Sequence, residues 1–191
     1  MTITHHAWAG PDWPPSPPRL LLLGDSHYLT DPDDDSAELT RDIVRDVRDG
    51  RRKIPFYSKA EALCRECLTT ASSSTTSFWN QVAFVNFIPV TIGTVSSAVP
   101  SAEMWQAGAP RFIRLLEELR PTHVLSLGQR QWDHIRFPPD WRSMTAPEDD
   151  DVRLWLMPTG DRIRATWVNH PSSRGFSTTK WKPRIEALLR N

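Results

Sequence analysis

Short runs of apolar residues recur along the chain, at 19–23, 82–87, 123–127 and 163–168. Each run is rich in leucine, β-branched or aromatic residues and is broken by a glycine, a proline or a group of polar residues. Short apolar runs that end in this way are typical of strands buried on both faces. The pattern therefore predicts four main strands, with residues 154–157 as a minor strand or edge.

The segments between these strands carry apolar residues at helical spacing. In the first segment, Leu39, Ile43, Val44 and Val47 would share one face of a helix. Residues 138–153, in contrast, are rich in proline and aspartate and are expected to form a loop. Helices are expected at 36–50, 58–70, 101–120, 129–136 and 183–190.

Strands that alternate with helical segments need long crossovers, which join parallel strands. The order of elements predicts an α/β protein with three layers, α/β/α, around a central, mainly parallel four-stranded sheet. Residues 1–18 include the run PDWPPSPP, which is too rich in proline for a helix or a sheet and predicts an extended lead-in. Residues 19–191 are then long enough for a single domain with its own core.

Composition and charge limit the functions that fit this chain. The formal net charge is +0, whereas a general binder of polyanions is usually basic. The charges are unevenly spread, however, because acidic residues concentrate in 31–49 and basic residues in 162–190, so one face can be locally positive. No apolar run reaches the roughly 18 residues of a membrane helix, and the N-terminus lacks the features of a signal peptide. A cytoplasmic protein that does not bind membranes is expected.

The two cysteines, Cys64 and Cys67, form a single C-x-x-C pair. A tetrahedral zinc site or an iron–sulfur cluster needs four ligands, and the sequence has no second cysteine pair. We therefore expect neither a metal nor another cofactor.

Polar residues with chemical use follow the ends of the main strands. Parallel α/β sheets bind their ligands at the carboxyl ends of the strands, so Asp25, Asn86 and His170 are expected to surround one pocket. The groups are, in chain order, Gly24-Asp25-Ser26-His27-Tyr28, Asn86, Gly128-Gln129 and His170-Pro171-Ser172-Ser173.

The sequence GDS at 24–26 resembles the first block of the GDSL esterase family, in which the serine is the nucleophile. Ser26 would take that role, with His170 as its base. Later blocks of the family are not matched. Arg130 stands where the family has an asparagine, and Trp167 stands where an aspartate would orient the histidine.

The same strand ends also resemble the uracil-DNA glycosylase superfamily, and this resemblance extends over most of the chain. It lies in the order and spacing of four motifs, each placed at a strand. They are a glycine and polar first motif at 24–28, a W-x-Q segment at 79–81 before a strand ending in Asn86, the segment LRPTHVLSLG at 119–128, and an HPS motif at 170–172 before a terminal helix.

The resemblance implies a uracil-DNA glycosylase-like fold and hydrolysis of the N-glycosidic bond of a flipped uracil, or another deaminated base, in DNA. Cleavage of this bond builds negative charge on the base and positive charge on the sugar. Asp25 and His170 would be the catalytic carboxylate and the donor to the base. Asn86 would read the base, and Tyr28, Ser26, His27 and Phe56 would line its site. Contacts to phosphates would come from Ser172, Ser173 and Arg174.

The first motif leaves an alternative open. Ser26 stands where the most active branch of the superfamily has its catalytic aspartate, and Asp25 comes one residue earlier. His27 replaces the usual proline. A non-catalytic member of the same fold that binds nucleic acid or a nucleotide therefore remains a second hypothesis. On the main hypothesis the partner is single- or double-stranded DNA, and a monomer is expected.

Overall fold

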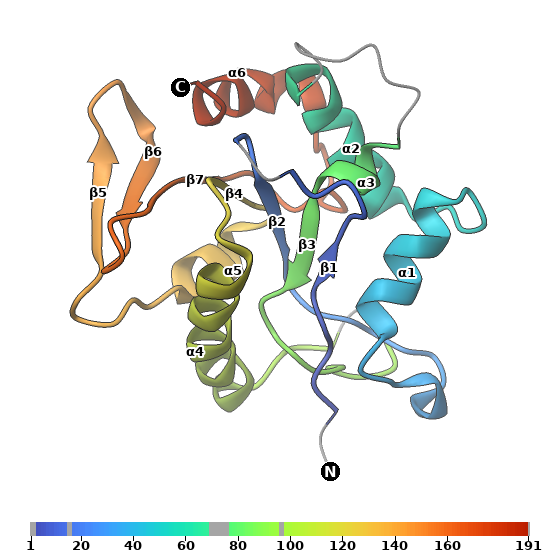
Figure 1. The fold of residues 1–191 in the computed structure, drawn as a ribbon. Helices are drawn as coiled ribbons and strands as arrows, with labels where there is room; N and C mark the ends of the chain where they lie inside the picture. The colour runs from blue at the N-terminus through green and yellow to red at the C-terminus, as the bar shows by residue number, and fades with distance from the viewer. Residues whose placement is uncertain (1–2, 15–16, 69–76, 96–97, 191) are drawn as a thin grey trace.

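The computed structural model describes residues 3–14, 17–68, 77–95 and 98–190. In these residues seven strands form one mixed sheet, in the order β1-β3-β2-β4-β7-β6-β5 (Figure 1). The strands are β1 (Trp8–Ala9), β2 (Leu20–Gly24), β3 (Ala83–Asn86), β4 (His123–Ser126), β5 (Arg142–Ala146), β6 (Asp149–Leu156) and β7 (Arg162–Trp167). The helices are α1 (Leu39–Arg48), α2 (Pro55–Leu68), α3 (Phe78–Gln81), α4 (Ala102–Leu119), α5 (Gln129–His134) and α6 (Thr178–Leu188), with a short 3-10 helix at Pro32–Asp34.

The centre of the sheet confirms the predicted parallel core. Strands β3, β2, β4 and β7 lie side by side and run in the same direction. They correspond to the four apolar runs of the sequence. The register places Gly24 of β2 beside Asn86 of β3, so these two strands end level with each other.

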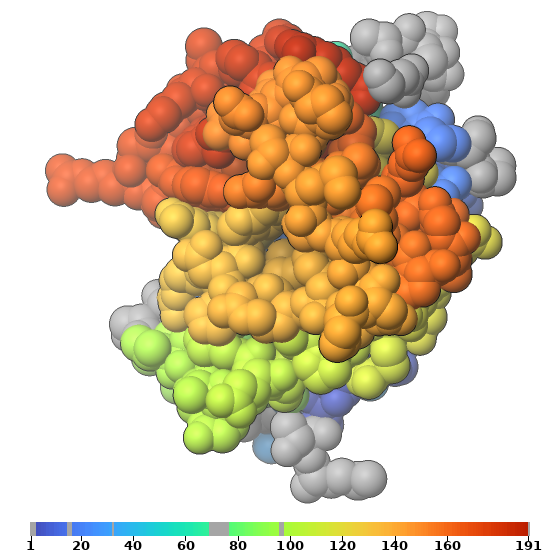
Figure 2. All heavy atoms as spheres, turned by 90° about the vertical axis from the view of Figure 1, so that its left-hand side faces the viewer, coloured from blue at the N-terminus to red at the C-terminus, as the bar shows by residue number. Residues whose placement is uncertain are grey.

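The sheet is wider than predicted because antiparallel strands extend it at both edges. Strand β1 pairs with β3, and a hairpin of β5 and β6 pairs with β7. The prediction of a loop at 138–153 is wrong, since most of this segment belongs to the hairpin. The first three residues of β5 are exposed, and an exposed edge strand lacks the alternating apolar pattern that a sequence would reveal. Figure 2 views the side of the molecule that carries the hairpin, with α6 above it.

The segment before the predicted domain also contributes to the fold. Trp8 is 5% exposed, and its indole Nε1 donates a hydrogen bond to the carbonyl oxygen of Trp79 at 2.9 Å. Strand β1 therefore joins part of the proline-rich lead-in to the sheet. Residues 15–16 of the lead-in lie outside the described residues.

The leucine run of β2 packs in two directions. Leu20 and Leu22 belong to a core cluster that includes residues of α1, α2, α3 and α6. Leu21 and Leu23 belong to a second cluster, which includes residues of α4. Because successive side chains of a strand point to opposite faces, the run is apolar throughout and helices cover both faces of the sheet (Figure 1).

Two helices begin earlier than expected. The last helix starts at Thr178 instead of Pro183, because the hydroxyl of Ser177 accepts a hydrogen bond from the backbone N–H of Lys180 and caps it. Helix α2 starts at Pro55, and proline is favoured at the first helical position. The end of this predicted helix, at 69–70, lies outside the described residues. Within the described residues, no helix is both long and apolar enough to cross a membrane.

Candidate functional site

The end of β2 and the end of β3 form the floor of the candidate site. A Cβ atom at Gly24 would lie 2.2 Å from Oδ1 of Asn86 and 2.9 Å from Cζ of Phe84. Only a glycine allows the carboxamide of Asn86 to lie across β2 in this way. Asn86 is 5% exposed, and among the described residues its carboxamide forms no hydrogen bond. Its donor and its acceptor are therefore not used by the described residues.

Asp25 follows Gly24 directly and is largely buried, with 12% of its side chain exposed. Its Oδ1 has no hydrogen-bond partner of normal geometry among the described residues. Burial raises the pKa of Asp25 above its ordinary value, although the Arg130 guanidinium and the Ser26 hydroxyl offset part of the rise. A buried carboxylate with an open oxygen is costly to keep and is typical of functional sites.

His170 begins a tight turn after β7, and this turn sets the tautomer of its imidazole. The backbone N–H of Ser172 donates to Nδ1 of His170 at 3.1 Å, and the N–H of Ser173 donates to its carbonyl oxygen at 2.8 Å. Because Nδ1 must act as the acceptor, the neutral ring carries its proton on Nε2. Burial, followed by the charge of Arg130, lowers the pKa of His170 below its ordinary value. The ring is therefore a neutral donor at physiological pH.

Helix α2 holds this turn in place. The ring of Phe56 lies 5.0 Å from the ring of His170 and 6.1 Å from that of Phe84, measured between centroids. Lys59 donates from Nζ to the carbonyl oxygen of Pro171 at 2.9 Å. The aromatic contacts thus run from His170 across to the floor at Gly24. Phe56 therefore packs between His170 and Phe84.

Arg130 joins the two sides of the site, and its role was missed from the sequence. It is the second residue of α5, which follows β4, and β4 lies between β2 and β7 in the sheet. Its Nη1 lies 3.6 Å from Oδ2 of Asp25, and its charge also acts on His170. The strand-end rule that selected the other residues would have found Arg130, because it comes two residues after Gly128.

The sheet sets the span of the site. Neighbouring strands lie about 4.8 Å apart, so β3, which ends in Asn86, and β7, after which His170 comes, are three steps or about 14 Å apart in the sheet. Strands β2 and β7, after which Asp25 and His170 come, are two steps or about 10 Å apart. Side chains of ordinary length can reach one small planar ligand across such a span.

The remaining residues of the two predicted motifs are distributed around this centre. The hydroxyls of Ser26 and Ser173 are buried and have no hydrogen-bond partner of normal geometry among the described residues, although the Ser26 hydroxyl is near enough to Asp25 to lower its pKa. Ser172 and Arg174 are exposed, as a contact to a nucleic-acid backbone requires. Tyr28 is 37% exposed at the surface beyond the turn.

His27 is not brought together with the other predicted residues. Its Nε2 is hydrogen-bonded to the hydroxyl of Thr40 at 2.8 Å, and its ring lies 5.2 Å from that of His5. Burial lowers the pKa of His27 to about 3, so the ring is neutral. The turn therefore directs His27 into a packed contact with α1 while its neighbour Asp25 faces Arg130.

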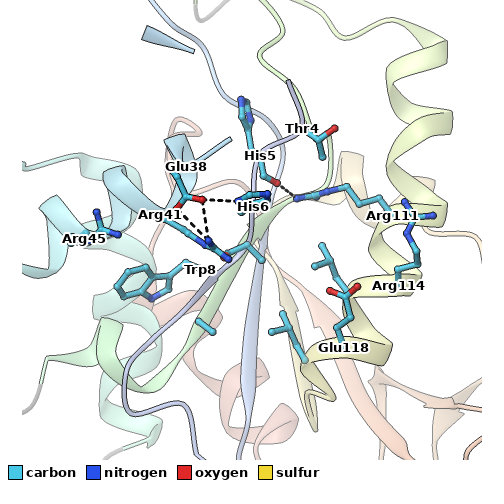
Figure 3. A pocket seen from close by; sticks show the side chains of 14 residues that line it. Thr4, His5, His6, Trp8, Glu38, Arg41, Arg45, Arg111, Arg114 and Glu118 are labelled. Carbon is cyan, nitrogen blue, oxygen red and sulfur yellow. Dashed lines mark hydrogen bonds and ion pairs between the residues drawn. The ribbon is translucent and has the colours of Figure 1, made fainter. Parts of the chain in front are cut away.

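The structure also contains a cavity of about 560 Å³ away from this site, between α1, α4 and the segment before β1 (Figure 3). Arg111 connects the two places. It is 8% exposed and donates to the backbone carbonyl oxygens of Asn86, at 3.0 Å, and of His5. The charged side chains that line the cavity are mainly basic: Glu38, Arg41, Arg45, Arg111, Arg114 and Glu118.

The esterase arrangement needs a hydrogen bond between Ser26 and His170. In the described residues neither the hydroxyl of Ser26 nor the ring of His170 makes this contact, and Nδ1 of His170 is already occupied by Ser172. The hydrogen bond that the esterase arrangement needs is therefore not formed among the described residues. Among models of known protein families none matches the chain, and no curated protein matches it.

Proposed function

We propose that this protein is a DNA-glycosylase-like enzyme that hydrolyses the N-glycosidic bond of a flipped uracil, or another deaminated base, in DNA. One observation carries the proposal. A carboxylate, a carboxamide and a neutral imidazole follow three strands that run in parallel and end at the same edge of the sheet. The order of motifs that resembles the uracil-DNA glycosylase superfamily supports the same reading.

The two sides of the site suit the two charges that develop during cleavage. As the bond between sugar and base breaks, the electron pair stays on the base, and His170 can donate from Nε2–H to the base oxygen that gains the charge. Asp25 faces the sugar, where its carboxylate stabilises the cation and directs a water toward the anomeric carbon. That water supplies the hydroxyl of the product sugar and a proton that ends on the base.

Recognition would rest on Asn86 and Phe56. The open carboxamide of Asn86 offers a donor and an acceptor, which match the paired oxygen and N–H of a pyrimidine edge. The ring of Phe56, held beside His170, would stack on the extruded base.

The test is release of free base from oligonucleotides that contain uracil, hypoxanthine or xanthine, in single- and double-stranded form. We expect release by the wild type and a loss of about 100-fold or more in His170→Ala. The matched control is His6→Ala, since His6 is an exposed histidine whose ring contacts Glu38 and not Asp25, Asn86 or His170 in the described residues. No release above the His170→Ala background with any of these bases would refute the enzyme proposal.

The contact between Asp25 and Arg130 favours a second candidate, a non-catalytic binder of nucleic acid. A carboxylate that faces a guanidinium at 3.6 Å is a weak activator of water. On this reading the protein binds oligonucleotides with an affinity that falls as salt rises, and no base is released from any of them.

A further inference from the structure

Arg130 lies beside the carboxylate of Asp25, where the sugar of the substrate would lie in the proposed reaction. Its guanidinium faces the carboxylate of Asp25, where the cleavage of a nucleoside would create a positively charged sugar. Two positive charges at the same carboxylate repel each other, so Arg130 must leave Asp25 before the reaction can proceed.

The contacts of Arg130 allow this movement. The distance from Nη1 to Oδ2 is 3.6 Å, which is longer than the roughly 2.8 Å of a well-formed charge-assisted hydrogen bond. The side chain of Arg130 is 54% exposed, and such ion pairs contribute little to stability. Its guanidinium also lies 5.4 Å from the ring centre of Trp105, which in turn stacks on His134 at 4.2 Å. The guanidinium is thus held at the surface of the site by weak contacts on two sides.

A phosphate is a stronger partner than Asp25 for such a side chain. The guanidinium can bind a phosphate through two parallel hydrogen bonds, and its exposed side chain is accessible to the backbone of a nucleic-acid strand. Ser172 and Arg174, which are also exposed, come after β7, the strand that pairs with β4, and Arg130 comes after β4.

We propose that Arg130 exchanges partners, from Asp25 in the free protein to a backbone phosphate of the bound strand, so that the carboxylate is released only when a strand is present. The phosphate contact stands independently of catalysis, whereas the release of Asp25 rests on the proposed glycosylase function. The exchange favours a nucleotide within a DNA strand over a free nucleoside, because only the DNA strand carries the phosphate that draws Arg130 away from Asp25.

The phosphate contact is tested by binding of a single-stranded oligonucleotide with one central uracil, followed by fluorescence anisotropy at several salt concentrations. In Arg130→Gln we expect about tenfold weaker binding at low salt and a salt-dependence slope that is smaller by about one. Arg130→Lys keeps the charge and should recover part of the affinity. The control is Arg136→Gln, because Arg136 is exposed just after the same helix and donates only to backbone carbonyls. Equal slopes in wild type and Arg130→Gln, with both proteins folded, would overturn the proposal.

The release of Asp25 is tested by comparing base release from the oligonucleotide and from free deoxyuridine. Arg130→Gln should lose about tenfold on the oligonucleotide but equal or exceed the wild type on deoxyuridine, since the carboxylate is no longer occupied. An equal loss on both substrates would overturn the exchange. If no base is released by any protein while the binding difference persists, the proposed function fails and the phosphate contact remains.

Discussion

Two clusters of buried polar side chains meet at the turn 25–27, and they differ in how their hydrogen-bonding groups are used. The site cluster consists of Asp25, Ser26, Asn86 and His170. The N-terminal cluster consists of His5, His27, Asp35 and Thr40. Residues adjacent in sequence therefore belong to different clusters. From the sequence alone, the polar residues of the two clusters cannot be told apart.

The N-terminal cluster is organised in pairs. His5 Nε2 lies 2.6 Å from Oδ1 of Asp35, and His27 Nε2 lies 2.8 Å from the hydroxyl of Thr40, although His5 Nδ1 has no partner among the described residues. In the site cluster, Asp25 Oδ1 and the Ser26 hydroxyl lack such partners. Paired buried groups stabilise a fold, whereas buried groups left open carry a cost that binding a ligand can repay. The comparison fits a structural role for the N-terminal cluster and the proposed binding role for the site cluster.

The largest expected effect separates the two acids. Asp25→Asn keeps the shape of the side chain but removes its charge, and we expect base release to fall by about 100- to 10,000-fold because the sugar cation loses its carboxylate. Asp35→Asn, the matched change in the N-terminal cluster, should alter release by no more than about threefold. Single-turnover rates on a uracil-containing oligonucleotide measure both. Similar losses in the two variants would remove the distinction between the clusters.

A smaller effect concerns the dependence of stability on pH. The folded pKa of His27 is about 3, below the ordinary value of 6.5, so the unfolded chain binds a proton in this range and the folded protein does not. The contribution of His27 to the free energy of unfolding is therefore fully present above about pH 6.5 and declines as pH falls toward 3. The decrease is about 2 kcal/mol at pH 5. In His27→Gln this loss should disappear, which urea unfolding between pH 5 and 8 would reveal. His123, whose pKa burial lowers to about 4, is unchanged in both proteins and supplies a common background. An equally steep pH dependence in the variant would contradict the paired, structural role of His27.

The smallest effect tests the cost of the open site. The folded pKa of Asp25 is raised, so its contribution to stability is full below the unfolded value of 3.8 and declines as pH rises through the folded value. The carboxylate thus destabilises the fold at neutral pH, and Asp25→Asn should raise stability by up to about 1 kcal/mol, or 2–4 °C in Tm. Thermal melts at pH 7 and pH 3 measure this, and the gain should vanish at the lower pH. A drop in Tm at pH 7 would mean that the contact with Arg130 outweighs burial.

The apolar pattern predicted the parallel core because β2, β3 and β4 are buried along their whole length and β7 carries buried residues at alternate positions. The hairpin of β5 and β6 could not be predicted in this way. Much of it is exposed, it includes Asp149, Asp150 and Asp151, and it is held by pairing with β7 that becomes visible only in three dimensions. Strand β1 is two residues long and was masked by the prolines that follow it.

For the site, the rule that ligands bind at strand ends selected Asp25, Asn86 and His170, which lie at or after the ends of three strands of the parallel core, with β4 between the second and the third. It did not separate His27 from Asp25, because the direction of each side chain depends on the turn. The rule was not applied to Arg130, which was noted only because it stands where the GDSL esterase family has an asparagine. The orientation of the His170 ring depends on a backbone N–H, which no pattern of residue types contains.

One guanidinium, that of Arg111, donates to the backbone carbonyl oxygens of both Asn86 and His5. The segment around His5 is therefore linked to the end of β3, which carries the residue proposed to recognise the base. This has a practical outcome for anyone preparing the protein. Removing the segment around His5, or placing a purification tag against it, would weaken the link through Arg111 and lower the activity measured, although no residue that contacts the substrate is changed.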